Sequence, residues 1–345
     1  MNVLELTRRL VDIDSVTPNE QAVGGFLADY LTPLAAHHGG RLERLPVENR
    51  RENILVSWGE PVVTLSTHQD TVPPFFPSRE DDEFIWGRGA CDAKGILAAM
   101  IGAAEGLLAD GVRNFALLFV VGEERGSAGA RAAARTPRGS RFLINGEPTG
   151  NRLAIGSKGA LRFEIAASGR MAHSAYPELG ESAIDKLLDA LGRIRAIPLP
   201  VDPDLGPATL NIGTLAGGEA PNVIPGAAGA EIMFRLVGDA DPLRHAVGLA
   251  VDGLAEAREV LCIPAQRLAT LPGFETTSVS YTTDIPVFGG AWGRPLLIGP
   301  GSIHVAHTEG ERIAKNELLE AVLIYQRLVR QLLASGASNP PDHTP

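Results

Sequence analysis

Short apolar runs that alternate with helical segments constrain the fold of this chain more than any other feature. Residues 62–70, 115–124 and 141–148 each form such a run, and residues 93–111 form a largely apolar helix that ends at a glycine. Runs of this length and composition are typical of strands that are covered on both faces. The pattern therefore predicts an α/β fold, with a mixed, mostly parallel sheet flanked by helices.

The elements around this centre follow from the same kind of pattern. Apolar residues at helical spacing predict helices, and short apolar or alternating runs predict strands. The expected helices are 2–13, 19–37 and 314–333, and the expected strands are 41–47, 52–58 and 295–302. Together with the central elements they would complete one helix-covered domain.

A different pattern begins after Gly159. The elements then follow the order strand, helix, strand, strand, helix, strand, which is the ferredoxin-like order. The expected strands are 160–168, 207–218, 229–237 and 260–268, and the expected helices are 180–197 and 241–257.

This change of pattern divides the chain. We expect residues 159–269 to form an inserted α+β domain, and residues 1–158 and 270–335 to form the two parts of the larger domain. Residues 336–345 are rich in Pro and Ser, a composition that predicts a disordered tail.

The composition excludes several classes of partner. The net charge of −10 disfavours nucleic acid and anionic membranes, because both attract positive surfaces. No apolar run reaches the roughly 18 residues of a membrane span, and the N-terminus does not have the pattern of a signal peptide. Two cysteines, Cys91 and Cys262, do not make a disulfide framework. We therefore expect a cytoplasmic protein with no membrane and no nucleic-acid partner.

Acidic and histidine side chains follow the predicted strands of the larger domain. Ligands of open α/β sheets bind outside the carboxyl ends of the strands, so these side chains would meet in one crevice. The side chains are those of His68, Asp70, Glu123, Glu124 and Glu147, with His304 and His307 after the last strand and Asp92 in the loop before the apolar helix.

This cluster predicts a metal centre. Buried carboxylates are costly unless a cation neutralises them. Imidazole and carboxylate ligands without a thiolate suit Zn²⁺, with Co²⁺ or Mn²⁺ as substitutes. The ligands are too many for one tetrahedral ion and fit two ions about 3.5–4 Å apart. Asp70 lies two residues after His68 on the same strand face, where it would hold the far ring nitrogen of that histidine.

Seven segments carry a resemblance to a known family. They are "STHQDTVP", "GRGACDAKG", "GEERGS", "NGEP", "RMAHSAYP", "APNVIPG" and "GPGSIHVAH", and they occur between His68 and His307 in that order. In this order they resemble the two-zinc amidohydrolases that include acetylornithine deacetylase, succinyl-diaminopimelate desuccinylase, aminoacylase and the glutamate carboxypeptidases. The resemblance covers nearly the whole chain. It implies a zinc-peptidase-like fold in which the inserted domain is a lid and dimerisation domain.

The resemblance also implies a role for each metal-site residue. His68 and Glu147 would bind one zinc ion, Glu124 and His307 would bind the other, and Asp92 would bridge the two. The peptide bond after the bridging Asp92 would be cis.

The same resemblance implies the remaining catalytic and substrate-binding residues. Glu123 would be the general base that deprotonates the attacking water. His173 would stabilise the oxyanion in the active site of the partner subunit, in a homodimer formed through residues 159–269. Asn222 and Arg235 would bind substrate, since a guanidinium suits a substrate carboxylate.

These assignments predict a metal-dependent hydrolase of N-acyl amino acids. The "GPGSIHVAH" segment favours a deacetylase of acetylornithine, acetyl-lysine or acetylcitrulline, as in amino-acid biosynthesis. Succinyl-diaminopimelate desuccinylase and a dipeptidase or glutamate carboxypeptidase are alternatives, because the "TEGERI" run after His307 departs from the run of the acetylornithine deacetylases. His304 would then lie beside the metal ligands or in solvent.

Two alternatives come from other classes of protein. A non-catalytic, metal-dependent binding protein would have lost a ligand or the base, and none is missing from the set above. A nucleotide-dependent α/β enzyme would need a glycine-rich turn between its first strand and a helix, and the sequence has no such turn.

Overall fold

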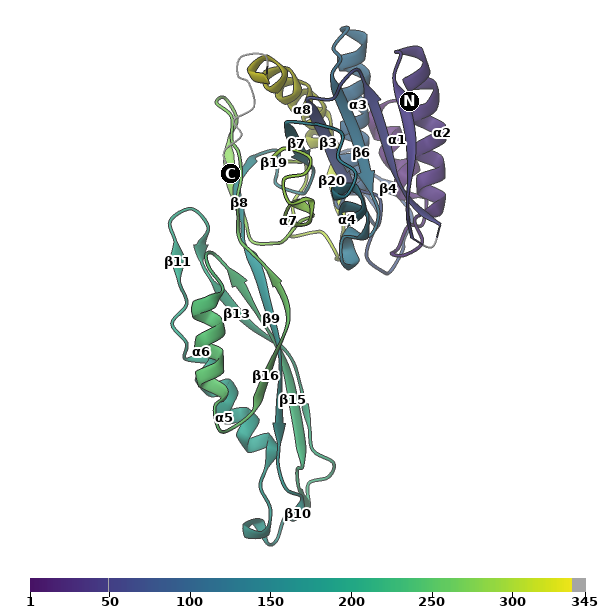
Figure 1. The fold of residues 1–345 in the computed structure, drawn as a ribbon. Helices are drawn as coiled ribbons and strands as arrows, with labels where there is room; N and C mark the ends of the chain where they lie inside the picture. Colours follow the sequence, from purple (N-terminus) through teal and green to yellow (C-terminus); the bar gives the residue numbers. More distant parts are fainter. Residues whose placement is uncertain (49, 337–345) are drawn as a thin grey trace. The chain divides into compact units, whose positions relative to one another are not determined.

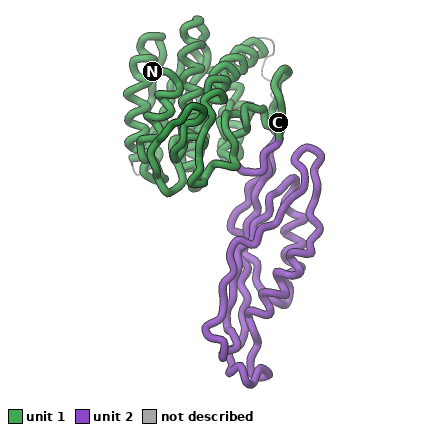
Figure 2. The backbone as a smooth tube through the Cα atoms, turned by 180° about the vertical axis from the view of Figure 1, so that it is seen from behind, with its two compact units in different colours: residues 1–155, 268–277, 283–345 green, residues 156–267, 278–282 purple. Residues whose placement is uncertain are grey.

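The computed structural model describes residues 1–48 and 50–336. They form two compact units, which Figure 2 shows in different colours. Unit 1 contains Met1–Ile155, Leu268–Thr277 and the chain from Thr283 onward, and unit 2 contains Gly156–Arg267 and Ser278–Thr282. Unit 2 thus covers nearly the residues of the expected insertion, while its role as a lid and dimerisation domain stays a prediction. Apart from Gly336, the expected tail 336–345 lies outside the described residues.

Unit 1 is built on a six-stranded sheet (Figure 1). The strand order is β1 (Arg41–Glu48), β2 (Arg51–Trp58), β6 (Phe115–Val120), β3 (Val63–His68), β7 (Phe142–Asn145) and β19 (Arg294–Leu297). The four strands from β6 to β19 are parallel, and β1 and β2 are antiparallel additions at one edge. The parallel strands therefore end at a common edge of the sheet, and the predicted mixed, mostly parallel sheet is confirmed.

Helices cover both faces of this sheet. They are α1 (Val3–Val11), α2 (Gln21–His37), α3 (Lys94–Ala109), α4 (Ala128–Ala134), α7 (Ile285–Phe288) and α8 (Lys315–Gly336). In β6, Leu117 and Phe119 belong to the core that contains α3, whereas Ala116 and Leu118 pack with the residues of α4 and α7. This two-sided burial explains why the strands read as continuous apolar runs.

Unit 2 has the predicted ferredoxin-like order. Its elements are β9 (Gly159–Ser168), α5 (Ala183–Arg195), β13 (Thr209–Gly217), β15 (Ala227–Leu236), α6 (Asp241–Val251) and β16 (Glu256–Ile263). The strands form an antiparallel sheet in the order β13-β15-β9-β16, and the helices bury Leu187, Leu191 and Val247 in a core with the strands. Burial alternates along β15, as expected for a sheet with one covered face.

Several details differ from the sequence prediction. The helix expected over 241–257 ends at Val251, and the strand expected from residue 260 begins at Glu256. Gly253, at φ +73°, lies in the turn between them, and this backbone conformation ends the helix sooner than its apolar spacing indicates.

Four small strand groups were not predicted because their strands are too short to show a period, and one of them pairs β10 (Ala172–His173) with β14 (Val223–Ile224). One sheet joins β4 (Arg79–Glu80), β5 (Phe84–Trp86) and β20 (Arg312–Ala314), and another joins β8 (Leu153–Ser157), β17 (Gln266–Arg267) and β18 (Thr276–Val279). β11 (Val201–Asp202) pairs with β12 (Gly206–Pro207). Within the described part of the chain, no helix has both the length and the hydropathy that crossing a membrane requires.

Candidate metal centre and active site

The predicted metal ligands of unit 1 lie at the carboxyl ends of its parallel strands. His68 is the last residue of β3, and Glu147 follows β7. Glu123 and Glu124 begin a short 3-10 turn, η1 (Glu123–Arg125), just after β6. Asp92 lies at the end of the loop before α3, and its peptide bond to Ala93 is cis, as predicted.

His68 is fixed by two contacts of its buried ring. Nδ1 lies 3.0 Å from the main-chain oxygen of Asp70, and Nε2 lies 3.0 Å from Asp92 Oδ1. A carbonyl oxygen can only accept, so Nδ1 carries the proton of the neutral ring and Nε2 presents its lone pair to Asp92. A lone pair and a carboxylate oxygen are both acceptors, so a proton or a metal ion must be shared between them. Although burial opposes it, the contacts with Asp70 and Asp92 raise the pKa of His68 well above its usual range.

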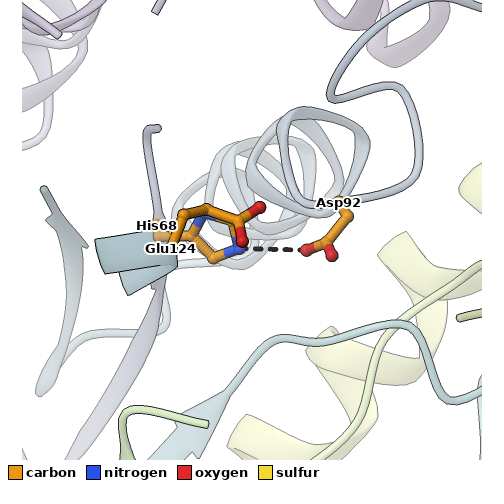
Figure 3. A group of neighbouring side chains, drawn as sticks. All are labelled: His68, Asp92 and Glu124. Atoms are coloured by element: carbon orange, nitrogen blue, oxygen red, sulfur yellow. Dashed lines mark hydrogen bonds and ion pairs between the residues drawn. The ribbon is translucent and has the colours of Figure 1, made fainter. Parts of the chain in front are cut away.

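Asp92 stands between two histidines, with one carboxylate oxygen toward each. Its Oδ2 lies 3.3 Å from His307 Nε2, and the same ring nitrogen lies 3.1 Å from Glu124 Oε1. Hydrogen bonds to Asp92 and Glu124 raise the pKa of His307 to about 10. In Figure 3, His68 and Asp92 face one another with Glu124 beside them, and the ligand atoms of these three residues lie within 4.8 Å of one another.

Asp70 faces the ring of His68 with both its main-chain oxygen and its carboxylate. The ring nitrogen binds its main-chain oxygen, while the nearer carboxylate oxygen is 3.6 Å away. The carboxylate also accepts hydrogen bonds from the main-chain N–H groups of Glu123 and Glu124, both at 3.1 Å, and from the Thr17 hydroxyl at 2.7 Å. Asp70 therefore holds the two glutamates as well as the histidine.

Glu123 and Glu147 show why this cluster suits a cation. Burial raises the pKa of Glu123 well above its usual range, and the charge of Glu147 adds to the shift. Burial also raises the pKa of Glu147, and Asp92 adds to it. Among the described residues, the buried Oε1 of Glu147 has no hydrogen-bond partner. An unpaired, buried carboxylate oxygen among other acids fits a metal ligand, since a divalent cation would remove the repulsion.

The other three predicted residues belong to unit 2. His173 ends β10 (Ala172–His173), which pairs with β14 (Val223–Ile224), so it lies next to Asn222 in the chain segment before β14. Both side chains are exposed. Arg235 is half-buried near the other end of the sheet, on β15 opposite Ala160. Burial lowers the pKa of Arg235.

The ring of His173 is suited to donate a hydrogen bond. Its Nδ1 accepts the main-chain N–H of Ala175 at 3.1 Å. The proton of the neutral ring is therefore on Nε2. An exposed ring N–H is the group that an oxyanion contact requires.

Sequence reasoning missed two buried acids near this centre. Asp284 is 1% exposed, and its Oδ1 has no partner among the described residues. Burial raises the pKa of Asp284 to about 6, against a hydrogen bond from Ser127. Glu311 is also 1% exposed and binds the loop of Asp92. Neither acid follows an apolar strand. Glu311 lies in the "TEGERI" run, whose difference from the acetylornithine deacetylases was the only sequence signal for either residue.

Two further residues near the proposed ligands, His304 and Cys91, have ordinary surroundings. His304 is exposed, and its main-chain N–H lies 3.3 Å from the hydroxyl of Ser302. Cys91 is buried, and its Sγ lies 3.4 Å from the main-chain oxygen of the same serine. Of the two histidines after β19, His307 is the one that contacts the acidic cluster.

Comparison with known proteins places this geometry in a family. The sequence model described as Peptidase family M20/M25/M40 matches residues 64–331. The chain belongs to this family. It is 41% identical to a probable carboxypeptidase of Aspergillus clavatus over 378 residues, which cover 96% of this chain and 82% of that relative. The resemblance stated from the sequence is therefore confirmed, and the chain is a metallohydrolase of the M20 type.

Solved structures of M20 proteins share the fold. Aminopeptidase PepT of Bacillus cereus superposes with a TM-score of 0.79 at 18% identity, covering 96% of this chain and 98% of that one. A dinuclear metal-binding peptidase of the M20 family from Bacillus subtilis gives a TM-score of 0.71 at 16% identity, covering 96% and 98%. The predicted α/β fold with an inserted domain is thus confirmed.

Proposed function

We propose that this M20 protein is a two-metal hydrolase that cleaves the amide bond of substrates of the form acyl–NH–CHR–COO⁻. The observation that carries the proposal is the placement of Asp92 between His68 and His307, with one carboxylate oxygen 3.0 Å and the other 3.3 Å from a ring nitrogen. A carboxylate with one oxygen on each side suits a bridge between two ions.

The residues divide into two ligand sets around this bridge. His68 and Glu147 would hold one ion, and Glu124 and His307 the other, with Zn²⁺ as the expected metal and Co²⁺ or Mn²⁺ as substitutes. When bound, the ions would polarise the scissile carbonyl and make water more acidic. The unpaired oxygen of Glu147 and the contact of Glu124 with His307 support this division.

Glu123 is the proposed general base. Its main-chain N–H is fixed by Asp70, as is that of the adjacent ligand Glu124. The base and a ligand are therefore held by one carboxylate at the end of β6. Glu123 would take a proton from the attacking water and deliver it to the nitrogen of the leaving amine.

Arg235 and His173 are proposed to act on different parts of the substrate. Arg235 would bind the carboxylate and His173 would stabilise the oxyanion. Asn222, which lies next to His173, would also bind substrate. On β15, Arg235 is eight residues from Ala227, the end of the strand near His173. At about 3.3 Å per residue this separation is about 25 Å, too far for both groups of one chain to reach one small substrate. This separation supports a homodimer through residues 159–269, in which His173 would serve the active site of the partner subunit.

The proposed substrate group occurs in the substrates of both enzyme classes predicted from the sequence, the deacylases and the carboxypeptidases. An N-acyl amino acid and a peptide share the acyl–NH–CHR–COO⁻ group, and the named relative is a probable carboxypeptidase. Within this class we propose deacetylation of acetylornithine, acetyl-lysine or acetylcitrulline. Desuccinylation of succinyl-diaminopimelate and dipeptide cleavage are the alternatives.

A hydrolysis panel tests the proposal by comparing each substrate with the same compound in which the carboxylate is replaced by a carboxamide. The panel holds N-acetyl-ornithine, N-acetyl-lysine, N-acetyl-citrulline, N-succinyl-diaminopimelate and simple dipeptides, each beside its carboxamide. We expect cleavage only of compounds with a free carboxylate. We also expect the acetylated amino acids to be cleaved faster than N-succinyl-diaminopimelate and the dipeptides. Equal cleavage of the carboxamides would reject carboxylate recognition, and cleavage of dipeptides alone would reject the deacetylase assignment.

A further inference from the structure

The loop that carries Asp92 lies between β5 and α3 and forms turns instead of strand or helix. Gly87 and Gly89 adopt φ values of +144° and +87°, in the region that favours glycine. Main-chain N–H groups of a buried turn segment must find partners outside regular structure. The partners in this loop therefore decide where the carboxylate of Asp92 stands.

Glu311 supplies these partners. The oxygen Oε1 accepts from three main-chain N–H groups of the loop, and the main-chain oxygen of Glu311 accepts from a fourth. The donors to Oε1 are Gly89 at 2.9 Å, Asp92 at 3.1 Å and Cys91 at 3.2 Å, and the donor to the main-chain oxygen is Gly87 at 3.1 Å. One buried carboxylate thus shapes the loop up to the bridging residue itself.

The charge of Glu311 is balanced inside the same loop. Arg88 Nη1 lies 2.5 Å from Oε2 of Glu311, and both side chains are buried. Arg88 Nε also donates to the main-chain oxygen of Pro74 at 3.2 Å. The carboxylate is therefore neutralised by a guanidinium and stays available to the N–H groups without a metal ion.

Glu311 also belongs to the segment of the second histidine ligand. Its main-chain N–H lies 3.4 Å from the oxygen of Thr308, the residue after His307. Gly310 in turn donates to the hydroxyl of Thr308 at 3.2 Å. Residue 311 is thus connected both to the loop of Asp92 and to the turn of His307, which come from distant parts of the chain.

We propose that Glu311 is a positioning residue of the metal centre, which sets Asp92 relative to His307 so that the two can share an ion. The inference rests on the proposed function, because it assigns Glu311 to the site described there. Glu311 does not touch the substrate or the reacting atoms. It acts through the main chain of Asp92.

Zinc titration of the metal-free protein tests this role. Glu311→Gln keeps the shape of the side chain but removes the charge that faces Arg88 and can place an NH₂ group against the loop. Loss of an outer partner of a metal ligand commonly lowers metal affinity or activity about 10–100-fold. We expect Glu311→Gln to bind at least one Zn²⁺ ion about 10–100-fold more weakly, as measured by competition with a chromophoric chelator. At saturating zinc we expect a lower kcat with KM unchanged.

Glu20→Gln is the matched control. Glu20 forms another buried pair, with Arg51, at 2.5 and 2.8 Å, and among the described residues its carboxylate accepts no hydrogen bond from the main chain of a proposed metal ligand. We expect this variant to lower the unfolding midpoint while Zn²⁺ affinity stays at the wild-type value. Equal loss of zinc in both variants would show a general effect on folding and overturn the proposal.

The outcomes separate this inference from the proposed function. Wild-type protein that binds no zinc rejects both. Wild-type protein with two zinc ions, beside a Glu311→Gln variant of unchanged affinity and kcat, rejects only the role of Glu311. If Glu311→Gln does not fold, Glu311→Asp replaces it, because it keeps the charge opposite Arg88 but retracts the oxygens from the loop. Reduced zinc affinity in that variant supports the proposal, and wild-type affinity overturns it.

Discussion

The metal-ligand edge of unit 1 and the His173 end of unit 2 are constructed in opposite ways. His68, Asp92 and Glu147 are buried, and Asp70 and Glu311 tie the surrounding loops together with hydrogen bonds. In unit 2, His173 and Asn222 are exposed on a two-stranded piece of sheet.

This difference fits the separate tasks that we propose for the two units. Groups that must hold ions need fixed positions, and contacts within one folded unit provide them, including for His307, which is exposed but contacts Asp92 and Glu124. A donor that acts only during the reaction can stay exposed until substrate and a second subunit cover it. We therefore expect changes in unit 1 to alter metal binding and chemistry, and changes in unit 2 to alter turnover or substrate binding with the metals still in place.

The largest expected effect follows from removing the bridge. Asp92→Ala should lose both metal ions and all detectable hydrolysis, because the proposed bridging carboxylate would serve both ions and the remaining acids would repel one another. Metal analysis of the purified variant measures this. Asp110→Ala, at an exposed acid just after α3, is the control and should keep the wild-type metal content. An Asp92→Ala variant that retains two ions would contradict the bridge.

The next largest effect should come from the base. Glu123→Gln should lower kcat about 10²–10⁴-fold, the usual contribution of general acid–base catalysis, while the metal content is unchanged. The adjacent Glu124→Gln should instead lose metal, because that side chain contacts His307. Kinetics and metal analysis of both variants check this. Normal turnover of Glu123→Gln would refute its assignment as the base.

A smaller loss is expected in unit 2. His173→Ala should lower kcat about 10²–10³-fold, as for loss of one oxyanion donor, without change in metal content or unfolding midpoint. Steady-state kinetics and a thermal melt measure the two quantities. A variant with less metal than the wild type would mean that the two regions are not separate in function.

Mixing two inactive proteins sharpens this prediction. His173→Ala subunits are allowed to exchange with Glu123→Ala subunits. If each site uses His173 of the partner subunit, one of the two sites in every mixed dimer has both Glu123 and His173. Activity should then return to about a quarter of the wild-type value, because half of the dimers are mixed and each has one complete site. Continued inactivity, with mixed dimers shown to form, would reject sharing of the site while leaving the metal chemistry untouched.

The smallest expected effect concerns substrate binding. Arg235→Lys should raise KM about 10–100-fold for an N-acyl amino acid, since a hydrogen bond to a charged group commonly contributes about 1.5–3 kcal/mol. The kcat value should change little. Arg258→Lys, at an exposed arginine paired with Glu164, is the control and should keep the wild-type KM. An unchanged KM in Arg235→Lys would remove Arg235 from the substrate site.

The sequence predicted the parts of the fold that have strong local patterns. The strands β3, β6 and β7 are almost entirely buried, so each appears as a short run rich in apolar or small residues, and the residues after these parallel strands lie at one edge of the sheet. The helix over 241–257 was drawn too long because apolar spacing continues past Gly253, where the backbone turns. Local spacing alone could not show this.

The tertiary contacts of the site were harder to predict. Glu311 acts through main-chain N–H groups of a loop from a distant part of the chain, and no local pattern marks such a partner. Asp284 is buried where the chain returns from unit 2 to unit 1 and does not follow an apolar strand. The carboxylate of Asp70 was assigned to His68 from strand geometry and lies 3.6 Å from its ring nitrogen, but strand geometry could not show that it also accepts from the N–H groups of Glu123 and Glu124.

The number of zinc ions bound per chain tests the central claim most directly. The claim is that unit 1 holds two ions on opposite sides of Asp92. Metal-free protein titrated with Zn²⁺, with binding followed by calorimetry and the bound metal counted by elemental analysis, should take up two equivalents per chain. Uptake of only one equivalent, or of none, would contradict the account.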